Sequence, residues 1–223
     1  MAILHGWKQR RPVDASVRLW LTESMATTEG ASPNDGLMNP ENWPGRSLPI
    51  KLLAIDGHGG SGKSTLADAL ADRLSAEVIR TDDFASWDNP FSWWPLLIEQ
   101  VLEPIGQGSV ELSYPRSKWW ADHHPEPVIG QPVTDVMILE GTAALRKEFR
   151  PYISYGIFVD TPKQLCLQRG LARDAGMDGK TDMEIEAMWN VWIAEEDAYM
   201  TRDNPQEYAD KIVDGSRPFA GQI

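Results

Sequence analysis

From residue 51 onward, short apolar runs alternate with segments whose apolar residues recur at helical spacing. Strands are predicted for the runs at 51–56, 77–81, 135–140, 155–160 and 211–214. Helices are predicted for the segments at 63–74, 95–105, 162–173 and 182–200. Strands that alternate with helices form βαβ units, which favour a parallel sheet with helices on both faces. The pattern therefore predicts an α/β fold with a doubly wound, parallel, five-stranded sheet.

The first 49 residues follow a different pattern. One amphipathic helix is predicted there by apolar residues at helical spacing, namely Val13, Val17, Trp20, Leu21 and Met25. Residues 26–49 are rich in Gly, Pro, Asn, Ser and Thr, which is typical of a loop. We therefore divide the chain into an N-terminal extension over 1–49, consisting of a helix and a loop, and a main domain over 50–223.

The stretch over about 87–132 shows no regular period and is an insertion in the main domain. It holds five of the ten tryptophans, which are Trp87, Trp93, Trp94, Trp119 and Trp120. Such a cluster forms either a satellite core or the wall of a substrate pocket, because pockets are lined mainly by apolar and aromatic side chains. The sequence leaves both interpretations open.

A phosphate-binding motif lies between the first predicted strand and the first predicted helix. It reads Gly57-His58-Gly59-Gly60-Ser61-Gly62-Lys63-Ser64, followed by Thr65, and fits G-x-x-x-x-G-K-[S/T]. The glycines let successive backbone N–H groups point at phosphates, Lys63 reaches the β and γ oxygens, and the Ser64 hydroxyl binds Mg²⁺. The following helix adds its positive N-terminal end. The motif predicts a P-loop NTPase fold that binds ATP or GTP with Mg²⁺.

Composition limits the partners. Asp and Glu outnumber Lys and Arg by 33 to 21, for a net charge of −12, which disfavours a nucleic-acid partner because phosphate contacts need a basic face. The single cysteine, Cys166, excludes an internal disulfide. No apolar run approaches the roughly 20 residues of a membrane helix. We therefore expect a cytoplasmic protein with no membrane partner, and the sequence leaves a homo-oligomer open.

A carboxylate pair follows the second predicted strand, in Thr81-Asp82-Asp83-Phe84. The carboxyl ends of parallel strands face the ligand crevice. A carboxylate placed there can accept the proton of an attacking hydroxyl during phosphoryl transfer. The alternative is that one aspartate only caps the next segment.

Two arginines, Arg169 and Arg173, lie four residues apart and therefore share one helix face. Such a pair can hold a transferring phosphoryl group and neutralise its developing charge. The Gly- and Asp-rich residues 175–180 that follow are typical of a mobile lid. Ordinary surface salt bridges are the alternative.

Several other polar residues receive simpler interpretations. His58, within the P-loop, is a candidate contact to phosphate or substrate. His123 and His124 have no third ligand at metal-site spacing and are interpreted as surface loop residues. Cys166 is expected in the core. The acidic run 195–197 is expected on a solvated helix face.

Four blocks of the chain resemble the uridine kinase and phosphoribulokinase family of P-loop kinases. They are residues 55–65, 81–84 and 138–141, and the stretch from 158–161 on to Arg169 and Arg173-Asp174, with a weaker block at 205–214. The resemblance spans roughly residues 50–215. It implies a nucleoside- or nucleotide-kinase-like P-loop fold, ATP and Mg²⁺ as cofactors, and a small-molecule hydroxyl as acceptor.

The resemblance also implies roles for individual residues. Asp82 becomes the base, Glu140 orients Mg²⁺-bound water or the substrate, and Arg169 and Arg173 become lid arginines. Asp83 and Phe84 belong to the acceptor block, and the remaining implied acceptor contacts are Tyr114 and Arg116. The chain departs from the family at 177–180, where further lid arginines are usual, and after Tyr114, where an Asp and a His are usual.

These observations predict an ATP-dependent kinase that transfers the γ-phosphoryl group to a hydroxyl of a small molecule. A nucleoside or nucleoside-like compound is the first choice, and a sugar, a pantothenate-like molecule or an antibiotic is the alternative. A nucleotide-dependent regulatory ATPase or GTPase is a third hypothesis, although the chain lacks the Asn-Lys-x-Asp signature of GTPases. Phosphorylation of nucleic-acid ends conflicts with the net charge.

Overall fold

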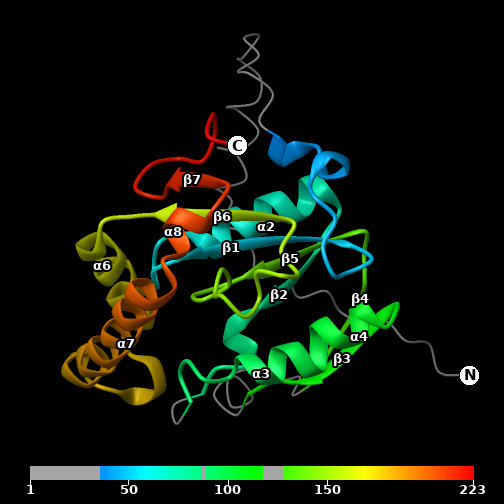
Figure 1. The fold of residues 1–223 in the computed structure, drawn as a ribbon. Helices are drawn as coiled ribbons and strands as arrows, with labels where there is room; N and C mark the ends of the chain where they lie inside the picture. Colours follow the sequence, from blue (N-terminus) through cyan, green and yellow to red (C-terminus); the bar gives the residue numbers. More distant parts are fainter. Residues whose placement is uncertain (1–35, 87–88, 118–127) are drawn as a thin grey trace, which may run out of the picture.

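The computed structural model describes residues 36–86, 89–117 and 128–223. Its centre is a five-stranded parallel sheet in the order β2-β5-β1-β6-β7 (Figure 1). The strands are β1 (Lys51–Gly57), β2 (Glu77–Arg80), β5 (Val136–Glu140), β6 (Tyr155–Asp160) and β7 (Lys211–Asp214). The predicted fold class and all five predicted strands are confirmed.

The central strand β1 is buried on both faces, as a parallel strand covered by two layers should be. Successive side chains of a strand point to opposite faces. Leu52 and Ala54 accordingly pack in one hydrophobic cluster, and Leu53 and Ile55 pack in the other. A continuous apolar run at the sheet centre therefore supports two separate cores.

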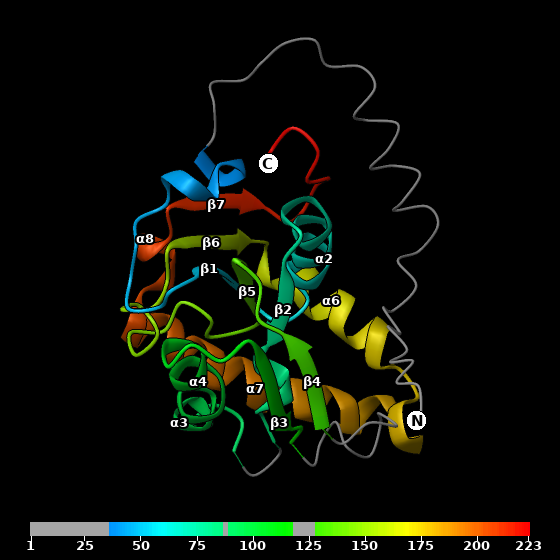
Figure 2. The ribbon, with the colours of Figure 1, turned by 90° about the vertical axis from the view of Figure 1, so that its right-hand side faces the viewer.

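Helices cover both faces of this sheet (Figures 1 and 2). The long helices are α2 (Lys63–Leu74), α6 (Lys163–Asp174) and α7 (Asp182–Asp203), and the short helix α8 (Pro205–Tyr208) precedes β7. Thr181 and Glu184 cap the start of α7 with a reciprocal capping box. The helices predicted at 63–74, 162–173 and 182–200 are confirmed. In the part of the chain that the structure describes, no helix is both long and apolar enough to cross a bilayer.

The helix predicted over 95–105 is confirmed, and the rest of the insertion is more regular than the sequence indicated. A continuous helical segment runs through α3 (Trp94–Leu97), the π-helical turn η4 (Ile98–Leu102) and α4 (Glu103–Gly106). An antiparallel pair, β3 (Glu111–Pro115) and β4 (Val128–Pro132), follows it. The prediction of an irregular stretch was wrong for this pair, because strands of five residues that each end in proline give little periodic signal.

The described tryptophans of the insertion lie in a core. Trp93 is 2% exposed and donates through Nε1 to the Pro90 carbonyl at 2.9 Å. Trp94 is partly buried against the same cluster. The satellite-core interpretation is therefore confirmed for these two residues. Trp87, Trp119, Trp120 and the pair His123 and His124 lie outside the described residues.

Residues 36–49 pack on the main domain through two short 3₁₀ turns, η1 (Gly36–Met38) and η2 (Pro40–Asn42). Leu37 and Trp43 are buried in the cluster that contains α2, and the Trp43 and Tyr155 ring centroids are 5.3 Å apart. The helix predicted over 13–25 lies outside the described residues. The domain boundary at residue 49 stays a prediction.

A fully buried carboxylate, Asp56, joins three parts of the molecule. Its Oδ1 accepts from the backbone N–H groups of Gly57 at 2.6 Å and Ala143 at 3.1 Å. Its Oδ2 accepts from Leu145 N–H at 2.7 Å and from the Tyr199 hydroxyl at 2.5 Å. Burial raises the pKa of Asp56, and the hydrogen bonds from Tyr199, Leu145 and Gly57, together with the charge of Lys63, counteract that effect. The carboxylate thereby ties the end of β1 to the loop after β5 and to α7.

Replacing Tyr199 by Phe tests the strength of this junction. The substitution leaves the Asp56 carboxylate buried with one donor fewer, so we expect the free energy of unfolding to fall by about 2 kcal/mol. Urea denaturation followed by circular dichroism measures it. The control is Tyr208→Phe, which removes a half-buried hydroxyl at 3.3 Å from the Arg150 carbonyl and should cost less than about 1 kcal/mol. Equal losses in the two variants would contradict a special role for Asp56.

Candidate active site

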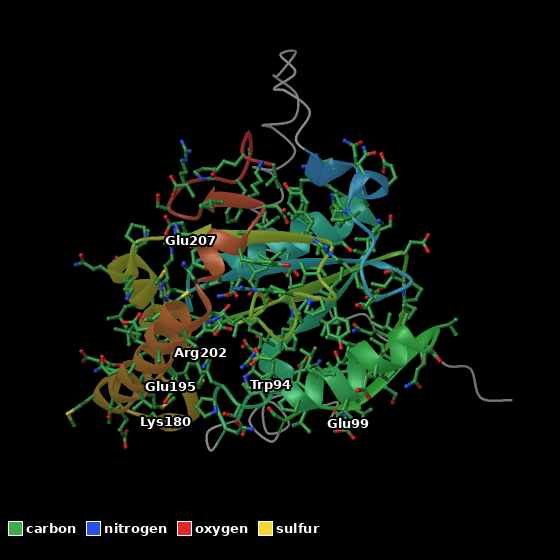
Figure 3. All side chains as sticks on the ribbon, viewed as in Figure 1. Trp94, Glu99, Lys180, Glu195, Arg202 and Glu207 are labelled. Atoms are coloured by element: carbon green, nitrogen blue, oxygen red, sulfur yellow. The ribbon has the colours of Figure 1, made fainter. Side chains whose placement is uncertain are left out.

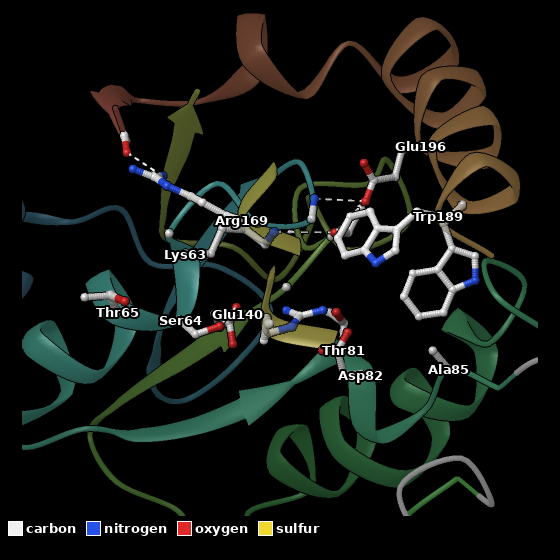
Figure 4. Close-up of a pocket in the computed structure, with 18 of the residues that line it drawn as sticks. Lys63, Ser64, Thr65, Thr81, Asp82, Ala85, Glu140, Arg169, Trp189 and Glu196 are labelled. Atoms are coloured by element: carbon white, nitrogen blue, oxygen red, sulfur yellow. Dashed lines mark hydrogen bonds between the residues drawn. The ribbon is translucent and has the colours of Figure 1, made fainter. Parts of the chain in front are cut away.

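A cavity of about 620 Å³ opens at the carboxyl ends of the strands (Figure 4). It is bordered by the P-loop, the ends of β2 and β5, helices α6 and α7, and the loop after β7. The predicted site residues that line it are Gly59, Gly60, Gly62, Lys63, Ser64, Thr65, Asp82, Glu140, Arg169 and Arg173. Residues from four distant segments of the chain therefore meet in one space, at the position expected for ligands of an open parallel sheet.

The P-loop keeps its shape through close packing against the start of α6. Gly60 has a positive φ of 79°, and a Cβ there would lie 2.3 Å from the Cys166 carbonyl oxygen. The Thr161 hydroxyl donates to the Ser61 carbonyl at 3.0 Å. Only glycine fits position 60, both because of its backbone conformation and because of this contact. Cys166 is buried here, as predicted.

Lys63 lies across the mouth of the loop and is 6% exposed. Its ammonium donates to the carbonyl oxygens of Gly57 at 2.9 Å and His58 at 2.7 Å. The Thr142 hydroxyl lies 3.5 Å from the same nitrogen. These partners hold a positive charge beside the backbone N–H groups of the loop, so this part of the cavity suits an anion.

Ser64 and Glu140 form a pair of oxygen donors beside the loop. The Ser64 hydroxyl donates to Glu140 Oε1 at 3.0 Å, while Arg80 donates to Glu140 Oε2 at 2.5 Å. The other arm of Arg80 bonds to Asp68 at 2.7 Å. Burial raises the pKa of Glu140, against the lowering effect of Arg80 and Lys63. A hydroxyl and a carboxylate are the hard ligands that Mg²⁺ prefers, so these residues fit that ion.

The two aspartates after β2 have different surroundings. Asp82 is exposed in the 3₁₀ turn η3 (Thr81–Asp83) and lines the cavity. Asp83 is 6% exposed, its Oδ1 is 3.6 Å from Arg116 Nε, and burial raises its pKa to about 6. Asp82 is therefore the aspartate of this pair that a ligand in the cavity can reach.

Four residues that the resemblance placed in the acceptor site lie beneath it instead. Phe84 and Tyr114 stack at 5.1 Å between ring centroids, and both are buried in the core. Among the described residues, those that line the cavity do not include Asp83, Phe84, Tyr114 or Arg116. In this structure they support the η3 turn and do not face the cavity.

The two arginines of α6 both reach the cavity, as their four-residue spacing predicted. Arg169 donates from Nη1 to the Gly215 carbonyl at 2.9 Å. Arg173 bonds through two nitrogens to Asp174, at 2.7 and 3.0 Å, and its guanidinium carbon lies 5.7 Å from the Trp189 ring centroid. The arginines are thus held in place by neighbouring groups.

Sequence reasoning missed the part of the site that α7 supplies. Trp189 is 3% exposed, and its Nε1 donates to Asp174 at 3.0 Å. Its ring fits over Gly170, where a Cβ would lie 2.2 Å from the indole. The prediction of a solvated face was wrong for Glu196, which is buried and lines the cavity. The seven-residue spacing of Trp189 and Glu196, two helical turns, is the signal that could have placed both on one inward face.

One part of the cavity is apolar and aromatic. It is formed by the insertion and by α7, through Pro90, Phe91, Trp93, Trp189 and Trp192. Trp93 belongs to this wall as well as to the core cluster. The pocket interpretation of the Trp-rich insertion is thus supported for this residue. The P-loop and the charged groups adjoin this part, and Trp189 contacts both Gly59 of the loop and Arg173.

The chain is similar to proteins known as uridine kinases. It is 28% identical to the uridine kinase of Lactobacillus johnsonii over 184 residues, which covers 73% of this chain and 85% of that protein. The uridine kinase of Proteus mirabilis is 26% identical over the same coverage. The chain is a uridine kinase-like P-loop kinase. The solved structure of a possible uridine kinase from Bacillus stearothermophilus shares this kinase's fold, with a TM-score of 0.51, 19% identity and coverage of 90% of this chain and 98% of that one. No family model matches the kinase.

The buried Asp83 makes the stability of this kinase depend on pH. Its pKa is about 6 in the folded chain against an ordinary 3.8, so between these values the folded state binds more protons than the unfolded state. Stability contributed by Asp83 therefore decreases as the pH rises through this window, by about 2 kcal/mol between pH 4 and 6 and by about 3 kcal/mol in total once the pH is well above 6. Asparagine cannot lose a proton, so the stability of Asp83→Asn relative to wild type should rise over that window.

Chemical denaturation at several pH values between 4 and 7 measures this difference. The control is Asp72→Asn on the exposed side of α2, which removes an aspartate charge away from Asp83. If the free energies of unfolding of Asp83→Asn and wild type differ by the same amount at every pH, the pKa of Asp83 is not raised.

Proposed function

We propose that this kinase transfers the γ-phosphoryl group of ATP to a hydroxyl of a nucleoside or nucleoside-like small molecule. The observation that carries the proposal is the arrangement around one cavity. A P-loop, two arginines and a Ser64–Glu140 pair face an exposed carboxylate, Asp82, which lies next to an aromatic wall. Phosphoryl transfer needs these parts together: positive charge around the phosphates, a metal site and an acceptor of the hydroxyl proton.

The nucleotide lies along the P-loop in this proposal, with its base toward the loop after β7. Phe219 of that loop packs over the P-loop, since a Cβ on Gly62 would lie 3.3 Å from its ring. Arg217, Pro218 and Phe219 line the same end of the cavity. A flat, partly apolar surface next to the phosphate cradle suits a purine base. ATP is the proposed nucleotide because the relatives are kinases.

Three cations act on the transferring group. Lys63 exchanges its carbonyl partners for phosphate oxygens, which it can do because those partners are neutral. Arg169 and Arg173 reach the cavity from the same face of α6. Positive charge held at fixed positions stabilises the charge that develops on the phosphoryl oxygens.

Ser64 and Glu140 would hold Mg²⁺ in this proposal. When bound, the ion would supply positive charge that offsets the negative charge of the nucleotide phosphates. Arg80 keeps the Glu140 carboxylate oriented toward Ser64, so a residue outside the predicted set fixes the metal-binding side chain.

Asp82 is the proposed base. It follows β2 at one edge of the sheet, whereas the loop after β7 lies at the other edge. The acceptor and the purine of the nucleotide therefore approach the P-loop from opposite sides in this proposal. A carboxylate at the exposed end of η3 can accept the proton of a hydroxyl that attacks the γ-phosphorus. Asp83 is already engaged with Arg116 and is not available for this role.

The acceptor lies against the aromatic wall. Phe91 and Trp192, which are less buried than Trp93, offer ring surface to a neutral planar compound, as a nucleoside base would be. A sugar is the second candidate, because the apolar face of a sugar ring can pack on the same rings. In the proposed complex, Tyr114 and Arg116 support the wall and do not contact the acceptor.

The experiment is a coupled assay of ADP release across nucleosides, sugars and other small alcohols, in the presence of Mg²⁺. We expect turnover that depends on the acceptor and that Asp82→Asn reduces by about 100-fold or more, the usual contribution of general base catalysis. The affinity for ATP should stay near the wild-type value, because Asp82 does not belong to the P-loop. Chelating Mg²⁺ should abolish turnover.

Asp72→Asn, the same substitution on the exposed side of α2, is the matched control and should leave turnover unchanged. Nucleotide hydrolysis that is indifferent to every acceptor would instead support a regulatory ATPase. Full activity of Asp82→Asn would remove this residue from the mechanism.

A further inference from the structure

Helix α7 places a carboxylate directly on the phosphate-binding loop. Glu196, labelled in Figure 4, accepts through Oε1 from the Gly59 backbone N–H at 2.9 Å. Its Oε2 lies 3.0 Å from His58 Nδ1. The Thr142 hydroxyl lies 3.4 Å from Oε1. The residue is 5% exposed, although it lines the cavity. A negative charge of the protein itself therefore occupies a backbone N–H group of a loop whose shape suits anions.

The contact between Glu196 and Gly59 lies at the end of the P-loop that is nearer to Asp82. Thr142 follows β5, which is the neighbour of β2 and therefore lies on the Asp82 side of the P-loop. Phe219 packs over Gly62, toward the other edge of the sheet. Gly59 is thus at the end of the loop that faces the acceptor. Gly62 is at the end that faces the proposed site of the nucleotide's purine base. Resting on the proposed function, the terminal phosphate of a bound nucleotide lies at the Gly59 end.

We propose that Glu196 determines specificity for the number of phosphates, because its carboxylate occupies the subsite of the terminal phosphate on the P-loop. A triphosphate must displace Glu196 from Gly59 in order to bind fully. A diphosphate fills the loop only as far as the β-phosphate and leaves the Glu196 contact in place. The free enzyme is therefore biased against ATP relative to ADP.

Electrostatics explain the exclusion. A carboxylate and a phosphate are both anions and cannot share one N–H donor, and like charges repel strongly at such short range in partly buried surroundings. The partners of Glu196 are a backbone amide, a hydroxyl and an imidazole. Of these, the amide is the group that a phosphate needs. No bond is made or broken, so the effect is on binding alone.

The position of Trp189 connects this displacement to the acceptor wall. A Cβ on Gly59 would lie 3.0 Å from Glu196 Oε1 and 3.1 Å from the Trp189 ring, so both side chains cover the same glycine. They sit on one face of α7, two turns apart. When the terminal phosphate displaces Glu196, it also meets the edge of Trp189. ATP binding therefore also affects the aromatic wall, because Trp189 belongs to that wall.

The test compares the affinities of wild type, Glu196→Gln and Glu195→Gln for ATP and ADP, with Mg²⁺ and without acceptor, by isothermal titration calorimetry. Glutamine keeps the shape of Glu196 and its acceptor oxygen but removes the charge. We expect Glu196→Gln to bind ATP about tenfold more tightly and ADP as wild type does. Glu195 is exposed on the same helix (Figure 3), so Glu195→Gln should change neither affinity.

Weaker ATP binding by Glu196→Gln, or an equal shift for ATP and ADP, would overturn the inference. If Glu196→Gln does not fold, Glu196→Asp replaces it: the shorter side chain withdraws the charge from Gly59 and should also favour ATP over ADP. An unchanged ratio in that variant overturns the inference as well. If Glu196→Gln gains affinity for ATP but not for ADP, and the enzyme shows no acceptor-dependent turnover, the role of Glu196 is upheld and the proposed phosphoryl transfer is contradicted.

Discussion

The hydrogen bonds of one buried carboxylate hold together the frame on which the site is built. Asp56 ends the central strand, and its partners come from the first residue of the P-loop, from the turn after β5 and from α7. A carboxylate without donors would not remain at this depth. Because the donors come from three segments that border the cavity, these bonds help to keep the segments in their relative positions. The phosphate cradle, the Glu140 strand and the helix of Glu196 thus depend on a group that does not touch the ligand.

The parts of this protein that were predictable have strong local signals. The P-loop motif, the buried run of β1 and the helix that starts at Lys63 follow from adjacent residues, and the structure places them as predicted. The shared face of Arg169 and Arg173 was predictable for the same reason, since residues four apart on a helix share a face. Lys63 was predicted by the motif, Asp82 by its place at a strand end, and Glu140 by the family resemblance. These residues line one cavity together with Arg169 and Arg173.

The parts that were not predictable depend on packing between distant segments. Nothing local to Tyr114 distinguishes a base contact from a core residue, and only the stacking on Phe84 decides that it is buried here. In the acidic run at 195–197, the rotation of α7 selects Glu196 for burial and leaves Glu195 exposed. That rotation is set by Tyr199 on Asp56 and by Trp189 on Gly170, which are contacts across more than one element. Such information lies in the tertiary structure and not in a short window of sequence.

The contact of Gly60 with the Cys166 carbonyl has a mechanical consequence. The first turn of α6 cannot shift without deforming the phosphate cradle, and the Thr161–Ser61 hydrogen bond fixes the same junction. A helix transmits this restraint along its length, so Arg169 and Arg173 travel with the P-loop as one rigid body. Any hinge must therefore lie beyond α6, where Gly176 and Gly179 both have positive φ. On this view the two guanidinium groups are preorganised for the phosphates, and the turn that joins α6 to α7 is the part of this region that can change shape while both helices stay in place.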